Sequence, residues 1–297
     1  MNFFLKIFKL LPPEIAHSFS LNSLNILHKL NLLRFISPKP KTINEFHFQG
    51  MVFKNKLGTA AGLDKNGDFI DALGALGFGF LEVGTVTPLP QYGNTKPRVF
   101  RNFNEDSIIN RLGFNNKGVD YLVKKLKSKK FDGVVGVNIG ANKSSQGDQR
   151  INDYLICLEK VHAYADYITV NISSPNTPNL RELHNKDDLK NLLGSIERKA
   201  IDEDIKIPLF LKISPDEPNE SIDSIIELSI SFALDKSHFT RLIVDPVFDS
   251  SSLSIFNISK SLASKIKSQP AFAKVTAVAL PIPLVAPVMY ANFNLFC

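Results

Sequence analysis

The 297-residue sequence predicts an α/β fold, and the architecture that fits best is a (β/α)8 TIM barrel with a small N-terminal helical extension. From residue 57 onward, short apolar runs alternate with longer segments of helical periodicity, which is typical of parallel strands joined by crossover helices. The runs are apolar almost throughout, so the strands are expected to be buried on both faces. Residues 45–297 also come close to the length of about 250 residues that such a barrel needs.

Six segments are expected to form strands: residues 57–61, 78–84, 133–139, 166–172, 207–213 and 241–244. Four segments between them are expected to form helices: residues 117–126, 148–165, 186–200 and 221–234. A doubly wound open sheet is the alternative. Its usual GxGxxG motif after the first strand is absent, however, which favours the barrel.

The first 41 residues form a separate region with six basic residues and a single acid, Glu14. Two lysines interrupt its apolar start, so the run is too short and too charged to span a bilayer. Pro12 and Pro13 suit the first turn of a helix. Two short basic amphipathic helices are predicted, which either lie in a membrane interface or fold onto the main domain as a cap. We therefore divide the chain into an N-terminal amphipathic helical domain over residues 1–41 and a barrel over residues 42–297.

The composition excludes several classes of function. Cys157 and Cys297 lie far apart and the six histidines form no HxH or HxxxH pair, so neither a disulfide scaffold nor a metal site is expected. The net charge of +6 comes without a nucleic-acid-binding motif. We interpret it as a solvated basic surface, and no nucleic-acid partner is expected.

Polar residues gather just after the predicted strands, where a barrel places its active site. The Asn- and Ser-rich run at 171–179 is open to a simpler interpretation as a turn. Lys212, in contrast, lies inside the fifth strand between apolar residues, where a buried ammonium needs an anion or a polar ligand. The amides of Asn138 and Asn171 suit a planar heterocycle with alternating C=O and N–H groups. Ser174 has no histidine or aspartate beside it, so a hydrolase triad is not indicated.

Six motifs occur in an order and at a spacing that resemble the dihydroorotate dehydrogenases: AAGLDK at 60–65, EVGTVTP at 82–88, KPR at 96–98, NRLGFNN at 110–116, NIG at 138–140 and NISSPNTP at 171–178. Each motif is weak alone, but the series is specific. The N-terminal extension with PEIAH at 13–17 is similar to the membrane-associated, quinone-dependent class 2 branch. Ser174 points to the same branch, because the soluble class carries a cysteine there.

The resemblance implies oxidation of (S)-dihydroorotate to orotate in pyrimidine (UMP) biosynthesis, with FMN as hydride acceptor and a quinone as final electron acceptor. It implies that residues 1–41 form a membrane and quinone domain and that the protein lies peripherally at the cytoplasmic side of the cell membrane. Ser174 would be the general base, with Thr177 as a candidate relay. The implied substrate residues are Lys65, Asn110, Arg111, Leu112, Gly113, Phe114, Asn171 and Asn176. The implied flavin residues are Ala61, Gly62, Leu63, Asp64, Lys65, Thr85, Asn138, Asn171 and Lys212.

The resemblance stops near residue 245. The family's Thr-Asn-Thr motif is replaced by LIVDPVFD at 242–249, and the glycine motifs that hold the FMN phosphate are missing. All 16 glycines lie at or before Gly194, although phosphate cradles rely on glycine. The alternative function is therefore an inactive, truncated or frameshifted remnant with an incomplete barrel that cannot hold FMN. A third candidate is another flavin barrel, such as a dihydropyrimidine dehydrogenase domain. Ser174 and the N-terminal helices argue against it.

Overall fold

The computed structural model describes residues 10–36, 45–103, 107–177, 180–214, 217–234, 242–244 and 288–290. Its main sheet contains six parallel strands: β3 (Leu57–Thr59), β4 (Phe80–Val86), β7 (Val134–Ile139), β8 (Tyr167–Asn171), β9 (Leu209–Ile213) and β10 (Leu242–Val244). All six predicted strands are confirmed. Each strand pairs with the next parallel strand along the chain, so the order never reverses. A doubly wound sheet needs such a reversal, and the barrel interpretation therefore holds.

The described part of the barrel is open. A seventh strand, β11 (Val288–Tyr290), runs antiparallel beside β3, and the sheet order ends at β10 on one side and β11 on the other. Six of the eight expected parallel strands thus lie within the described residues, as a curled half-barrel. Most of the divergent segment 245–297 lies outside the described residues.

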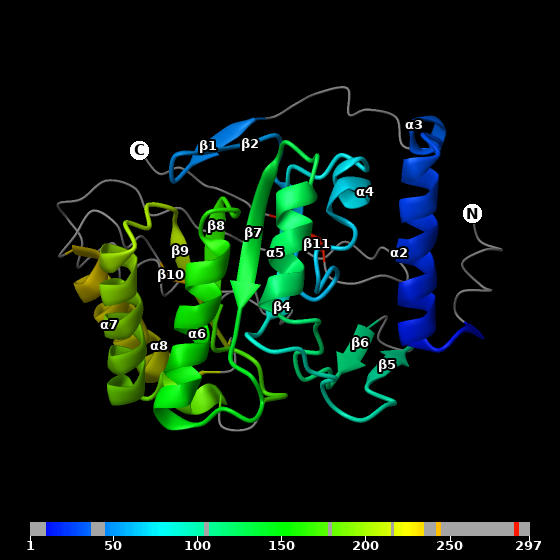
Figure 1. Ribbon diagram of the computed structural model, residues 1–297. Helices are drawn as coiled ribbons and strands as arrows, with labels where there is room; N and C mark the ends of the chain where they lie inside the picture. Colours follow the sequence, from blue (N-terminus) through cyan, green and yellow to red (C-terminus); the bar gives the residue numbers. More distant parts are fainter. Residues whose placement is uncertain are drawn as a thin grey trace.

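Helices cover the outer face of the sheet (Figure 1). The elements after the strands are α4 (Ile70–Gly74), α5 (Val119–Ser128), α6 (Gly147–Val161), the 3-10 helix η1 (Leu180–His184), α7 (Lys186–Asp202) and α8 (Asn219–Leu234). The four predicted helices are confirmed, with bounds that differ by at most four residues. The short helix α4 and the helix η1 were not expected, since five residues are too few to show a helical period.

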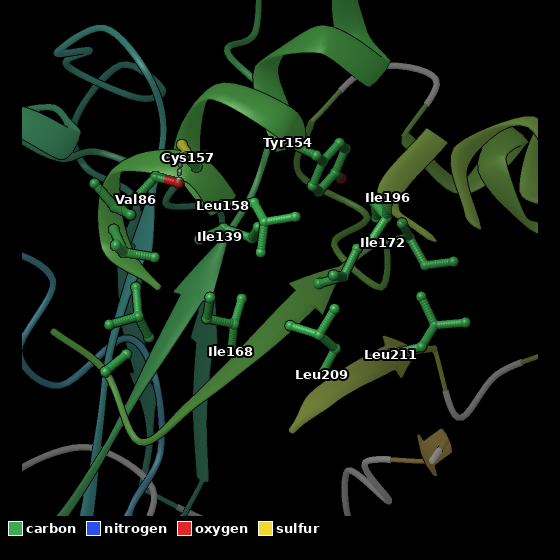
Figure 2. Close-up of a cluster of buried hydrophobic side chains, with 14 of the residues drawn as sticks. Val86, Ile139, Tyr154, Cys157, Leu158, Ile168, Ile172, Ile196, Leu209 and Leu211 are labelled. Carbon is green, nitrogen blue, oxygen red and sulfur yellow. Dashed lines mark hydrogen bonds between the residues drawn. The ribbon is translucent and has the colours of Figure 1, made fainter. Parts of the chain in front are cut away.

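The main hydrophobic core lies between these helices and the sheet. Figure 2 shows Ile139, Ile168 and Leu209 of neighbouring strands pointing toward Leu158 of α6 and Ile196 of α7. Four of these five side chains are fully buried, and Leu209 is nearly so. The strands read as continuous apolar runs because this layer buries one of their faces and the barrel interior buries the other.

A smaller aromatic cluster fills the barrel interior at the end where the strands begin. The antiparallel hairpin of β1 (Phe46–Phe48) and β2 (Met51–Phe53) covers this end (Figure 1). Phe53 packs edge-on against Phe80 at 5.4 Å, and Phe48 stacks on Phe210 at 6.3 Å between ring centroids. The hairpin therefore acts as a plug that excludes water from the lower end of the barrel. The sequence reasoning did not identify this hairpin.

The N-terminal region forms α2 (Pro13–Lys29) and α3 (Leu33–Ile36). The predicted start of a helix at the proline pair is confirmed, with Pro13 in the first turn and Glu14 beside it. Most of the first predicted N-terminal helix, which precedes the proline pair, lies outside the described residues. Helix α2 buries Ala16 and Leu21 against the barrel, while Phe19 and Ile26 remain 57% and 58% exposed. Within the described residues, no helix has the length and apolarity needed to cross a membrane.

Gly136 on β7 tests how closely the interior is packed. A Cβ atom at this position would lie 2.0–2.5 Å from atoms of the Tyr167 ring. We expect Gly136→Ala to lower the free energy of unfolding by about 1–3 kcal/mol, because the ring has to move into the plug. Gly194→Ala on α7 is the matched control, since its Cβ would make ordinary contact with Phe232 at 3.7 Å. It is expected to stabilise by about 0.5–1 kcal/mol. Urea denaturation measures both, and equal stability of G136A and wild type would contradict the packing.

Candidate active site

The loop after β3 is tied to the end of β4 by backbone hydrogen bonds. The Gly62 N–H donates to the Gly84 oxygen at 2.8 Å, and the Gly84 N–H donates to the Asp64 oxygen at 3.1 Å. Gly62 has φ +109°, a conformation that favours glycine, and no atom of the described residues outside its own chain neighbours lies within 4 Å of the place where a Cβ would be. The loop therefore leaves open space beside Gly62, which lets a flat ligand approach the backbone. Ala61 and Leu63 flank this space, and Leu63 itself is buried.

Asp64 holds the shape of its own loop. Its buried carboxylate accepts hydrogen bonds from the backbone N–H groups of Asn66, Asp68 and Phe69 at 3.3, 3.0 and 2.7 Å. Loss of hydration raises the pKa of Asp64 to about 6, while the three backbone donors act in the opposite direction. The three hydrogen bonds that this carboxylate accepts all come from its own loop, so the predicted flavin contact at this position would come from the backbone.

Lys65 lies half-buried next to this loop. Loss of hydration, and then the nearby charge of Arg98, lower the pKa of Lys65 to about 8, whereas Glu14 opposes this shift. A lysine in such a position regains stability as a cation when an anion binds beside it. The site thus offers a positive charge that responds to an anionic ligand.

The carboxyl ends of β4, β7 and β8 carry a layer of hydrogen-bonded amides and a hydroxyl. Thr85 donates to Asn138 Oδ1 at 2.6 Å, and Asn171 Nδ2 donates to the same oxygen at 3.1 Å. Strand register places Lys212 of β9 directly opposite Asn171. The structure therefore brings Thr85, Asn138, Asn171 and Lys212 together, as expected for residues on consecutive parallel strands. A heterocycle bound here would face donors and acceptors in fixed positions.

The loop after β8 carries Ser174. Its Oγ accepts a hydrogen bond from the Asn176 N–H at 3.2 Å. Tyr154 of α6 donates to the backbone oxygen of Asn171 at 2.8 Å, which anchors the start of the loop. Thr177 Oγ1 is buried and has no hydrogen-bond partner among the described residues. A buried hydroxyl without a partner is costly, so this atom is a candidate contact for a ligand or a water.

The segment 110–114 meets the Ser174 loop across Asn94. This segment follows the hairpin of β5 (Val99–Asn102) and β6 (Ser107–Asn110). Asn94 Nδ2 donates to the backbone oxygens of Arg111 and Asn176 at 3.0 and 3.3 Å. Phe114 has φ +51° and is buried, while Arg111 is exposed. Asn110, Leu112 and Gly113 complete the segment, and the predicted substrate residues of these two loops are therefore adjacent.

Helix α2 contacts the base of the site at two points. Glu14 Oε1 accepts hydrogen bonds from Arg98 Nε and Nη2 at 3.0 and 2.9 Å, and the Arg98 side chain is nearly fully buried. One turn later, His17 Nε2 donates to the Leu63 oxygen at 2.9 Å, and burial lowers the pKa of His17. Helix α2 thus folds onto the barrel on one side, while its Phe19 and Ile26 side chains stay exposed.

The profile of the family described as dihydroorotate dehydrogenase matches residues 44–248. The chain belongs to the dihydroorotate dehydrogenase family. It is 48% identical over 244 residues to the dihydroorotate dehydrogenase (quinone) of Buchnera aphidicola, covering 81% of this chain and 72% of that protein. It is 50% identical over 230 residues to the Acinetobacter baylyi protein of the same name, covering 76% and 67%. The predicted resemblance to the quinone-dependent class is confirmed.

Solved structures of dihydroorotate dehydrogenases agree with the fold. The Eimeria tenella enzyme in complex with ferulenol superposes with a TM-score of 0.65 at 29% identity, covering 82% of this chain and 69% of that one. The chain thus spans roughly two thirds to 72% of the length of these relatives. The family match ends at residue 248, close to the point where the motifs stop.

Family membership implies a flavin cofactor, and the described residues fit its ring system. The open space beside Gly62 and the amides of Asn138 and Asn171 offer a flat, polar surface. The glycine motifs that the resemblance assigns to the phosphate end would follow β10, and most of that part of the chain lies outside the described residues. The roles assigned to individual site residues stay predictions.

Glu14→Ala tests the docking of α2. We expect a loss of about 2 kcal/mol in unfolding free energy, because the nearly buried guanidinium of Arg98 loses its carboxylate partner. Glu159→Gln is the control, since it removes an exposed partner of Lys199. Its effect is expected within about 0.5 kcal/mol. Chemical denaturation gives both values, and limited proteolysis should cut the E14A helix faster. If the two variants behaved alike, the buried ion pair would not hold the helix.

Proposed function

We propose that this chain oxidises (S)-dihydroorotate to orotate, with FMN as hydride acceptor and a quinone as final electron acceptor, as a step of pyrimidine biosynthesis. The observation that carries the proposal is the meeting of three loops, 60–65, 110–114 and 171–177, around the amide layer at one end of the barrel. The names of the relatives support the same reaction. They also favour an active enzyme over an inactive remnant or another flavin barrel.

Substrate binding is assigned to the three loops. Dihydroorotate carries a carboxylate, and Lys65 supplies a cation whose charged form an anion stabilises. The side chains of Asn110, Asn171 and Asn176 supply amides for the ring's C=O and N–H groups. Phe114 and Leu112 give the ring an apolar contact. The hydrogen bonds of Asn94 to both facing loops hold this arrangement before substrate arrives.

Proton removal is assigned to Ser174 Oγ, which takes the proton from C5 of dihydroorotate. FMN, when bound, accepts the hydride that leaves C6. A serine is a weak base, so it needs a path for the proton and a site closed to water. Thr177 Oγ1, buried three residues away, is a hydroxyl available for that path. Lys212 at the end of β9 would stabilise negative charge that develops nearby.

The exposed apolar side of α2 supports contact with a membrane surface. Ile15, Phe19, Ile26 and Leu30 are each more than half exposed, although all are large apolar side chains. The same helix contacts Leu63 and Arg98 at the site, so a quinone dissolved in the bilayer would approach from this side. We therefore propose peripheral attachment at the cytoplasmic side of the cell membrane through the N-terminal region.

Flavin content and Ser174 variants test the reaction directly. The purified chain, supplied with FMN, is expected to retain about one flavin per chain, detected by absorbance and by release on denaturation. Ser174→Ala should slow anaerobic flavin reduction by dihydroorotate about 10²–10⁴-fold, because the base is lost, while flavin binding stays unchanged. Ser174→Cys should recover part of the rate. A folded chain that binds no FMN would instead support the inactive remnant.

Lys65 predicts a pH dependence of substrate capture. Because its pKa is lowered to about 8, the cation is lost as pH rises through that value. We expect kcat/KM for dihydroorotate to fall about tenfold per pH unit above pH 8. Lys65→Met should reduce kcat/KM at pH 7 and abolish this decline. Lys117→Met is the control for a surface lysine, since Lys117 pairs with Asp68 at the exterior. A decline that persisted in K65M would assign the titration to another group.

A further inference from the structure

Glu82 is a buried carboxylate to which the proposed mechanism gives no task. It lies in the middle of β4, faces the barrel interior and is 6% exposed. Its Oε1 accepts a hydrogen bond from Asn138 Nδ2 at 2.9 Å. Its Oε2 accepts from Tyr167 and Thr169 at 3.0 and 3.1 Å. All three donors stand on β7 and β8, so the carboxylate joins three strands beneath the amide layer.

The amide layer forms a chain with a direction. Asn138 turns its Nδ2 to Glu82, which leaves its Oδ1 to accept from Asn171 Nδ2 at 3.1 Å. The Oδ1 of Asn171 points away from Asn138 and accepts hydrogen bonds from the N–H and the Oγ of Ser173 at 3.0 and 2.8 Å. The chain therefore runs from Glu82 to the residue directly before Ser174.

The group at each end of this amide chain acts in only one way, as an acceptor at Glu82 and as a donor at the Ser173 N–H. An asparagine amide has nearly the same shape after a half-turn, so its neighbours decide which end is the oxygen. The Glu82 carboxyl group accepts all three of its hydrogen bonds, and the backbone N–H of Ser173 only donates. A reversed chain would set the nitrogen of Asn171 against that N–H and the oxygen of Asn138 against Glu82. Both contacts are repulsive, so a single direction is stable.

We propose that Glu82 is a positioning residue that sets the direction of the Asn138–Asn171 amide chain. Through this chain it determines which amide atoms face a flavin and holds Ser173, the neighbour of the proposed base. The link to flavin rests on the proposed function. The direction of the amide hydrogen bonds is a property of the polypeptide alone and does not depend on that function. Water is kept from the carboxylate by Tyr167, whose ring packs on Phe210 of β9, beneath the plug, at 5.2 Å between centroids.

Three variants distinguish the effect of losing the hydrogen-bond acceptor, the effect of losing the carboxylate and a general effect on folding. Glu82→Gln keeps an oxygen that can accept from Asn138 but removes the carboxylate. Glu82→Met removes the acceptor at similar length. Tyr167→Phe is the matched control, because it removes one hydrogen bond to the same carboxylate without touching the amide chain. Thermal denaturation checks that each variant is folded before the other measurements.

The first readout needs no flavin. In 15N-labelled protein, the side-chain NH2 signals of Asn138 and Asn171 should be protected from exchange with water in wild type, E82Q and Y167F. In E82M the Asn138 signal should shift and exchange at least tenfold faster, because its partner is gone. If E82M left these signals unchanged, the proposal would be wrong whatever the chain does with flavin.

The second readout uses FMN. Flavin affinity, from quenching of flavin fluorescence, should fall about tenfold in E82M and stay within about threefold in E82Q and Y167F. The reduction potential of bound flavin should become more positive in E82Q and E82M but not in Y167F, because both substitutions at Glu82 replace the carboxylate with an uncharged group. Equal affinity and potential in all variants would overturn the positioning role. If wild type bound no FMN, the proposed function would fail, while the amide signals would still decide the role of Glu82.

Discussion

The register between β4, β7, β8 and β9 determines the level at which each polar side chain lies inside the barrel. Gly84 stands opposite Asn138, Asn138 opposite Thr169, and Asn171 opposite Lys212. Because side chains alternate along a strand, a slip of one residue in any pair would turn these groups outward into the apolar layer. The amide layer, the Ser174 loop and the Glu82 contacts all depend on this one alignment.

Burial of so many polar groups is tolerated because each one has partners. Glu82 receives three hydrogen bonds, and the Asn138 and Asn171 amides bond to each other and to Thr85. A fully satisfied network in a low-dielectric interior is rigid, whereas a partly satisfied one is costly. His184 shows the other extreme. Its Nδ1 lies 2.6 Å from Glu217 Oε1, but neither ring nitrogen makes a hydrogen bond within the described residues.

Sequence patterns predict the outer architecture well and the interior poorly. The six strands stand out as apolar runs and four helices show a helical period. Both patterns arise because the strands and helices pack against each other in the outer layer of the barrel. In a barrel the inner face is also buried, so strand β4 shows no clean alternation, and Glu82 and Tyr167 resemble ordinary strand residues. The available sequence signal for a polar inner face was the presence of polar residues two positions apart on neighbouring strands. The hairpin of β1 and β2 is too short to show a period, and its role depends on distant partners.

The site residues also divide into those that the sequence predicts and those that it does not. Those in loops after strands, such as Lys65 and Ser174, follow from position and from the motif series. The ion pair of Glu14 with Arg98 does not, because 84 residues separate the partners and nothing local connects them. The task of Asp64 was also hidden, since a carboxylate that serves its own loop looks the same in sequence as one that serves a ligand.

The plug hairpin has a consequence for biosynthesis of the chain. Phe48 stacks on Phe210, although about 160 residues separate them, and long separations of this kind slow folding. The hairpin leaves the ribosome long before β9 does, so its aromatic side chains stay exposed to water and to other chains in the interval. Nascent chains that stall before β9 would therefore carry an unsatisfied aromatic surface, the kind of surface that chaperones bind.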